Sequence, residues 1–185
     1  MKYDKKKALI FSLVKALQVE FFGIFVMLFF MAIRLAMGTF GNLMFGFTGL
    51  MCAVCIMADY GMKQGEIARE RARLHGDGVK VGFGWVIGVV SMAPAFITTL
   101  LLALSKLEII GNFMPAYKIL NAALFPLMDL FAHSADVKDM SPLVLIMTFI
   151  FPFLYLFSSY VGFRLSYNRV DVKEKVVYKH DKKED

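Results

Sequence analysis

Three arginines at alternate positions, Arg69, Arg71 and Arg73, lie in a polar segment of an otherwise apolar chain. A guanidinium group can bind phosphate through two parallel hydrogen bonds, so closely spaced arginines favour a surface that binds a polyanion. Structured RNA and acidic lipid headgroups are the two polyanions that such a surface would attract. The candidate RNA-binding residues are Lys63, Arg69, Arg71, Arg73, His75, Asp77, Lys80, Arg164, Arg169, Lys173 and Lys175.

The acidic residues of the same segment support a simpler interpretation. Glu66 and Glu70 lie three residues before Arg69 and Arg73, respectively, a spacing that forms ion pairs on a solvated helix. The segment would then set membrane topology and bind nothing. The Gly-Asp-Gly sequence at 76–78 is too short for a phosphate-binding loop and predicts a turn, in which Asp77 is either simply exposed or contacts a base edge or a hydrated cation.

Three ionisable residues, Lys15, Glu20 and Arg34, interrupt the first long apolar stretch. Charged groups are costly inside a bilayer, and they usually face the interior of a helix bundle or extend towards the interface. We expect Lys15 and Arg34 to extend towards opposite membrane surfaces. Glu20 is harder to place near water, which favours pairing with another helix or a part in the passage of ions or protons.

Neither a metal site nor a catalytic centre is indicated. Cys52 and Cys55 share a helix face, but all three histidines lie outside the apolar stretches, and a tetrahedral metal site needs further ligands. We therefore expect the cysteines to pack, with no metal and no cofactor. No nucleophile, base and orienting residue occur at a recognisable spacing, so the chain is not expected to be an enzyme.

The composition predicts that a membrane domain positions these residues. Hydrophobic residues make up 58% of the 185-residue chain and charged residues only 19%, against about 25% charged in soluble domains. Four apolar stretches approach the roughly 20 residues that a helix needs to cross a bilayer. They lie at about 8–37, 40–59, 81–105 and 142–165. We expect an all-α integral membrane protein, because helices satisfy their own backbone groups in lipid.

The distribution of basic residues predicts the topology. Sixteen of the 21 Lys and Arg residues fall in the segments 1–7, 59–80 and 164–185, which places both termini and the basic loop in the cytoplasm. A four-helix transmembrane domain would then cover 1–166, followed by a polar cytoplasmic tail at 167–185. The outer loop carries apolar residues at helical spacing over 115–133, which predicts an interfacial or re-entrant helix.

Small residues within the apolar stretches predict close helix packing. Gly84 and Gly88 are four residues apart, and Gly46 and Gly49 are three apart, which suits tight contacts within the bundle or in a homodimer. We expect a homodimer that uses one of these pairs. Prolines at 94 and 152 are expected to kink the third and fourth helices.

The layout resembles small four-span membrane proteins of Gram-positive bacteria. The features that carry the resemblance are the basic N-terminus, the helical hairpin, the polar loop that closes on Gly-Asp-Gly, and "YVGFRLSYNRV" followed by "KEKVVYKHDKK". Among these proteins the chain looks most like the membrane protein associated with the ornate, large, extremophilic (OLE) RNA. In its loop motif that family has an Asp where this chain has Ile67, with Glu66 beside it. The resemblance implies a bacterial cytoplasmic-membrane protein that anchors a structured noncoding RNA in a stress response.

Two other classes of function remain open from the sequence. A small transporter or transporter subunit would use Glu20, Asp59 and the kinked helices to line a path. An accessory protein of a larger membrane complex would need the bundle alone. The favoured expectation is an RNA-binding membrane anchor that acts through its basic cytoplasmic face, with structured RNA and the lipid bilayer as partners.

Overall fold

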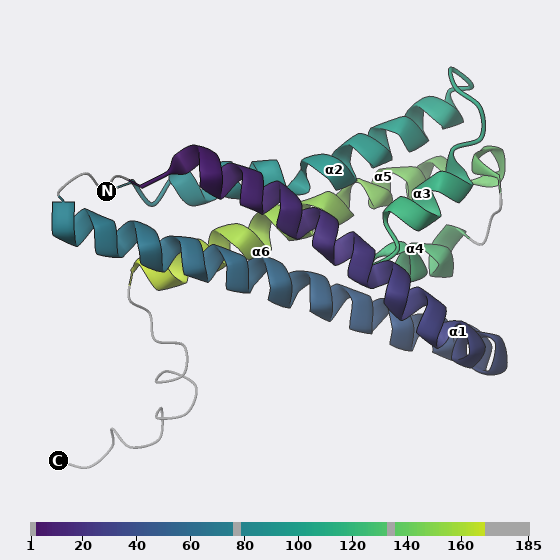
Figure 1. Ribbon diagram of the computed structural model, residues 1–185. Helices are drawn as coiled ribbons and strands as arrows, with labels where there is room; N and C mark the ends of the chain where they lie inside the picture. The colour runs from purple at the N-terminus through teal and green to yellow at the C-terminus, as the bar shows by residue number, and fades with distance from the viewer. Residues whose placement is uncertain (1–2, 76–78, 133–135, 169–185) are drawn as a thin grey trace, which may run out of the picture.

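The computed structural model describes residues 3–75, 79–132 and 136–168, and over these ranges every regular element is helical (Figure 1). Four helical segments are long and apolar enough to cross a membrane, which confirms that part of the sequence prediction. They are Lys5–Phe29, Ala36–Leu74, Phe83–Lys106 and Pro142–Tyr167. Large apolar side chains cover the outside of the first segment, with Phe21 63% and Leu28 62% exposed. An apolar surface of this kind suits contact with lipid.

Helix α1 (Lys5–His75) contains the first two candidate spans and reverses direction at Gly38. The φ angle of Gly38 is 54°, a conformation that side chains with a Cβ rarely adopt and that glycine tolerates. The two halves of α1 run back from this point towards the same end of the molecule (Figure 1). Most of the segment 59–80, predicted as a loop, is therefore helical, because α1 continues to His75.

The helices that follow in the chain are α2 (Phe83–Lys106), α5 (Pro142–Thr148) and α6 (Ile150–Tyr167). α5 and α6 together form the fourth candidate span, and the helix is interrupted at Phe149. Proline has no backbone N–H, so Pro152 cannot donate to the carbonyl of Thr148, which accounts for a break one turn before it. α2 continues through Pro94 as one helix.

The predicted outer helix over 115–133 is divided into two short helices. They are α3 (Met114–Leu120) and α4 (Phe125–Ala132), and a 3₁₀ turn, η1 (Val137–Asp139), follows. The backbone N–H groups of Leu124 and Phe125 both bond to the carbonyl of Asn121, which forms the turn between α3 and α4. The sequence pattern missed this turn because apolar residues keep a helical spacing on both sides of it, although Asn121 interrupts them.

Glycines bring the helices together within the single chain. A Cβ at Gly88 of α2 would lie 2.7 Å from the carbonyl oxygen of Leu156 in α6, and one at Gly84 would lie 2.9 Å from the ring of Phe163. Gly46 and Gly49 likewise face Leu127 and Ala123. The glycine pairs predicted to form a tight interface are thus occupied inside the bundle. The predicted homodimer, which no contact here tests, would need another surface.

Candidate functional site

The start of α1, the end of its second half, the start of α2 and the end of α6 meet at one end of the bundle, called here the basic end (Figure 1). Its described basic residues are Lys5, Lys6, Lys7, Lys63, Arg69, Arg71, Arg73, Lys80 and Arg164, and its acidic residues are Asp4, Asp59, Glu66 and Glu70. The fold therefore gathers the predicted basic residues that the structure describes from three separate segments. Basic groups outnumber acidic ones there.

The basic residues of this end differ in their surroundings. The guanidinium of Arg69 donates to the carbonyl oxygen of Ser166 at 2.8 Å, which satisfies a carbonyl in the last turn of α6. Lys63 forms an ion pair of 2.7 Å with Asp59 one turn before it. Arg71 is half-buried, whereas Arg73, Lys80 and Arg164 are exposed. The exposed three are the best placed to reach a large ligand.

Several predicted residues lie outside the described part of the molecule. These are Asp77, Arg169, Lys173 and Lys175, together with the side chains of His75 and Arg34. The same holds for the Gly-Asp-Gly turn and for the C-terminal tail.

Glu20 occupies the middle of the first candidate span and is 9% exposed. Its carboxylate accepts a hydrogen bond from the hydroxyl of Tyr155 in α6 and another, at 3.4 Å, from the backbone N–H of Ala123. Among the described residues Glu20 forms no ion pair. The carboxyl group thus joins α1 to α6 and to the turn between α3 and α4.

The same turn is held from its other side by α2. The amide nitrogen of Asn121 donates to Thr98 at 2.9 Å and to the carbonyl of Tyr117 at 3.1 Å. Ala123 fits between Gly23 and Gly49, one glycine from each half of α1, and a Cβ at Gly23 would lie 2.7 Å from the Cα of Ala123. The turn is therefore hydrogen-bonded to α2 and packed closely against both halves of α1.

Sequence reasoning singled out Glu20 but missed Tyr155, Asn121 and Thr98, which bond to Glu20 or to the same turn. Each carries a hydroxyl or amide within an apolar stretch, and that was the available signal. It is a weak signal, because many such groups only bond to the preceding turn of their own helix, as Thr48 does to the carbonyl of Met44.

One ion pair joins α3 to α4, and another joins the loops beside them. Lys118 approaches Asp129 at 3.7 Å, and Lys138 approaches Glu108 at 2.9 Å. The hydrogen bond from Lys138 lowers the pKa of the Glu108 carboxyl below its usual range, and it raises the pKa of the Lys138 ammonium. Lys106 donates to the carbonyl of Lys138 at 2.6 Å. These charged groups are thus bonded to neighbours in the same chain.

The remaining predicted polar residues make local contacts. Lys15 donates to Gln18 at 2.8 Å on its own helix, so it does not pair with Glu20. Cys52 and Cys55 are free thiols, and Cys55 is exposed on α1. Within residues 3–75, 79–132 and 136–168, no three His, Cys, Asp or Glu side chains come together as a metal site would require.

Comparison of the chain with models of protein families, with curated proteins and with solved structures gives no match, so the physical features described above carry the functional argument.

Proposed function

We propose that this chain is a membrane-anchored RNA-binding protein, which holds a structured RNA at the cytoplasmic membrane of a bacterium through its basic end. The observation that carries the proposal is the meeting of exposed cations from separate segments, namely Arg73 of α1, Lys80 before α2 and Arg164 of α6. Cations fixed at the ends of packed helices suit binding to the phosphates and shape of a folded RNA. The resemblance to the OLE-associated family points in the same direction.

The orientation in this proposal follows from the positive-inside rule, which places the basic end in the cytoplasm. A cysteine at position 72, in a chain without Cys52 and Cys55, tests it in intact cells. An impermeant maleimide added from outside should leave Ala72→Cys unlabelled until the membrane is opened. Rapid labelling of intact cells would show that the basic end lies outside the cell, and the RNA proposal would then be wrong.

The binding experiment uses the full chain in nanodiscs of zwitterionic lipid and a long structured RNA as the probe. The double variant Arg73→Gln with Lys80→Gln should bind more weakly than wild type. Its log–log salt dependence should be flatter by roughly 0.7 to 0.9 of a unit for each phosphate that the variant no longer neutralises. The matched control, Lys106→Gln with Lys138→Gln, removes the same charge near α3 and should bind like wild type. If the two double variants bind RNA with equal affinity, the basic end does not bind RNA and only sets the membrane topology.

The identity of the RNA is a separate experiment. Wild-type protein and the Arg73→Gln, Lys80→Gln variant, each purified from cells after crosslinking, would be compared by sequencing the RNA that they retain. One RNA enriched with wild type and depleted with the variant would identify the ligand. A retained population that matches total cellular RNA for both proteins would argue against a dedicated RNA.

One observation favours a second candidate function, a small proton-coupled transporter. Glu20 is a buried carboxyl group in a candidate span, and groups of this kind mark ion or proton paths in membrane proteins. Asp59, the other acid expected to line a path, is instead paired with Lys63. Proteoliposomes with an imposed pH gradient distinguish the two functions. Proton flux in wild type that Glu20→Gln abolishes would favour transport, and flux no greater than in empty liposomes would exclude it.

We also propose that the α3–α4 segment is re-entrant. Ala123 packs between Gly23 and Gly49, and both glycines lie well inside candidate spans. The turn would therefore lie within the bilayer rather than on its surface. A cysteine at Ile119, whose side chain is 52% exposed, should react slowly with an impermeant maleimide in nanodiscs. Reaction as fast as that of a cysteine at the exposed Lys138 would place α3 in water.

A further inference from the structure

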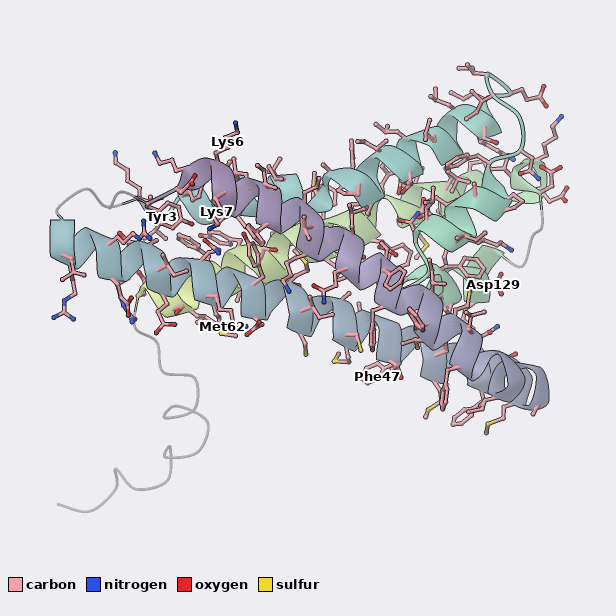
Figure 2. The ribbon with its side chains drawn as sticks, viewed as in Figure 1. Tyr3, Lys6, Lys7, Phe47, Met62 and Asp129 are labelled. Atoms are coloured by element: carbon pink, nitrogen blue, oxygen red, sulfur yellow. The ribbon has the colours of Figure 1, made fainter. Side chains whose placement is uncertain are left out.

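A groove separates the beginning of α1 from the last part of the same helix, where both reach the basic end. It encloses about 300 Å³, which is the lower limit for small-molecule sites. One wall comes from the first turns of α1 and includes Lys7 and Phe11, and the other includes Gln64, Ile67 and Arg71. Figure 2 shows Tyr3 and Lys7 between the two parts of α1, whereas Lys6 points away from them.

Hydrogen bonds fix the walls of this groove in place. The hydroxyl of Tyr3 donates to Gln64 at 2.9 Å, and the hydroxyl of Tyr60 donates to the carbonyl oxygen of Ala8. The ring of Tyr3 also packs edge-on against Phe83, with ring centroids 5.7 Å apart. Burial raises the pKa of Tyr3, so its hydroxyl stays neutral. The groove is therefore formed before any ligand arrives.

The charges that line the groove favour an anion. Lys7 and Arg71 bring two positive charges and Asp4 brings one negative charge. The carboxylate of Asp4 already accepts the backbone N–H of Lys7 at 2.9 Å, as the cap of α1. The positive end of the α1 dipole lies beside the same residues and adds to their field. An arginine beside a helix N-terminus suits a phosphate group.

The rest of the lining is apolar and partly exposed. Phe11 is 46% and Ile67 is 38% exposed. The first apolar stretch begins after Lys7, and the second gives way to charged residues from Asp59 onward, so the groove lies where both spans leave the apolar region. Lipid phosphates of one leaflet lie at that level, with their acyl chains towards the middle of the span. A free phosphate or an RNA backbone would leave the apolar wall unused.

We propose that this groove is a binding site for an anionic phospholipid. Lys7 and Arg71 bind its phosphate, and Phe11 and Ile67 contact the first part of its acyl chains. The proposal depends on membrane insertion alone and not on RNA binding, since the exposed Arg73, Lys80 and Arg164 do not line the groove.

The test measures thermal unfolding of the full chain in a mild detergent while phosphatidylglycerol is added. A ligand that binds only the folded state raises the melting temperature with its concentration. Wild type should be stabilised by phosphatidylglycerol but not by phosphatidylcholine or soluble glycerol phosphate at equal concentration. Equal stabilisation by phosphatidylcholine would show that the negative charge of the headgroup is not recognised. Equal stabilisation by glycerol phosphate would make the occupant a soluble phosphate.

Variants connect the effect to the groove. Lys7→Gln and Arg71→Gln should each weaken apparent binding of phosphatidylglycerol about tenfold, the effect of removing one charge-assisted hydrogen bond. The matched controls Lys6→Gln and Arg73→Gln remove the same charges from the same helix outside the groove and should bind like wild type. Arg71→Lys serves if Arg71→Gln does not fold, and it should recover only part of the affinity. If the groove and control variants lose affinity equally, the lipid effect is a general surface charge effect and the proposed site is wrong.

Discussion

Around Glu20 and the α3–α4 turn, polar side chains are buried and bonded to partners in the same chain, whereas at the basic end most of them are exposed. Glu20, Asn121 and Asp129 are all less than 10% exposed. Arg73, Lys80 and Arg164 are exposed side chains at the ends of helices or just outside them. The two regions carry similar chemical groups but place them in different surroundings.

The difference follows from the cost of desolvation. A carboxyl or amide removed from water must find a partner or it costs free energy, so Glu20 and Asn121 bind neighbouring elements. A lysine or arginine at a helix end remains hydrated and loses little by having no protein partner. We infer that the Glu20 region stabilises the fold and that the basic end is free to bind. Arg69, which bonds to Ser166, and Lys63, which pairs with Asp59, are exceptions within the basic end.

The largest expected effect tests the packing of the turn against α1. A Cβ at Gly49 would overlap the backbone of Ala123, so Gly49→Ala should lower the free energy of unfolding by about 3 kcal/mol. Gly82→Ala is the matched change at the basic end, where nothing lies within 4 Å of the new Cβ. It should alter stability by less than about 0.5 kcal/mol. SDS-induced unfolding of both variants measures the difference. Similar decreases in the free energy of unfolding would show that Ala123 is not tightly packed against Gly49.

Glu20→Ala should be the next largest change. It leaves the hydroxyl of Tyr155 and the backbone N–H of Ala123 without their acceptor, at a cost of about 2 kcal/mol in total. Glu20→Gln keeps one acceptor oxygen for the backbone N–H of Ala123, and its amide N–H can donate to the hydroxyl of Tyr155. This variant should therefore unfold close to wild type. Thermal unfolding followed by circular dichroism compares the two. A decrease in Glu20→Gln as large as in Glu20→Ala would mean that the ionised carboxylate itself is required.

A smaller effect separates two arginines on the same helix. Arg69→Ala removes the bond to Ser166 and should cost about 1.5 kcal/mol of stability. Arg73→Ala should leave stability within about 0.5 kcal/mol of wild type and weaken RNA binding instead. The two variants, measured for unfolding and for RNA affinity, should show opposite patterns. If both variants change stability and RNA affinity in the same way, Arg69 and Arg73 do not have separate structural and binding roles.

The smallest effect concerns the exposed pair of Glu108 and Lys138. The pKa of Glu108 is lowered by Lys138, so the stabilisation from this group is present above the usual pKa of a carboxyl group. It disappears as the pH falls through the lowered value. The pKa of Lys138 is raised, so its contribution disappears only as the pH rises through that value. NMR titration of Lys138→Ala should show the Glu108 pKa closer to that of a free glutamate. An unchanged value would mean that the pair does not persist in solution.

The sequence by itself determined the helical membrane class and the four candidate spans. These follow from local quantities, namely the length of each apolar stretch and the need of a spanning backbone to bond within itself. The chain reversal also has a local cause, because the glycine-rich stretch between the first two spans contains Gly38, which adopts a positive φ angle. Helix α1 ends at His75, next to Gly76, and glycine is the usual residue after a helix end, although the predicted second span stopped at about residue 59.

Only the tertiary structure decided which polar groups meet. Glu20 and Tyr155 are 135 residues apart, and no spacing rule connects a carboxyl group in the first span with a hydroxyl group in the last. The break between α3 and α4 was missed for a related reason: Glu20 and Thr98, which bond to this turn, belong to other helices. The groove at the basic end is likewise invisible in the sequence, because Lys7 and Arg71 come to line one groove only after α1 folds back on itself at Gly38.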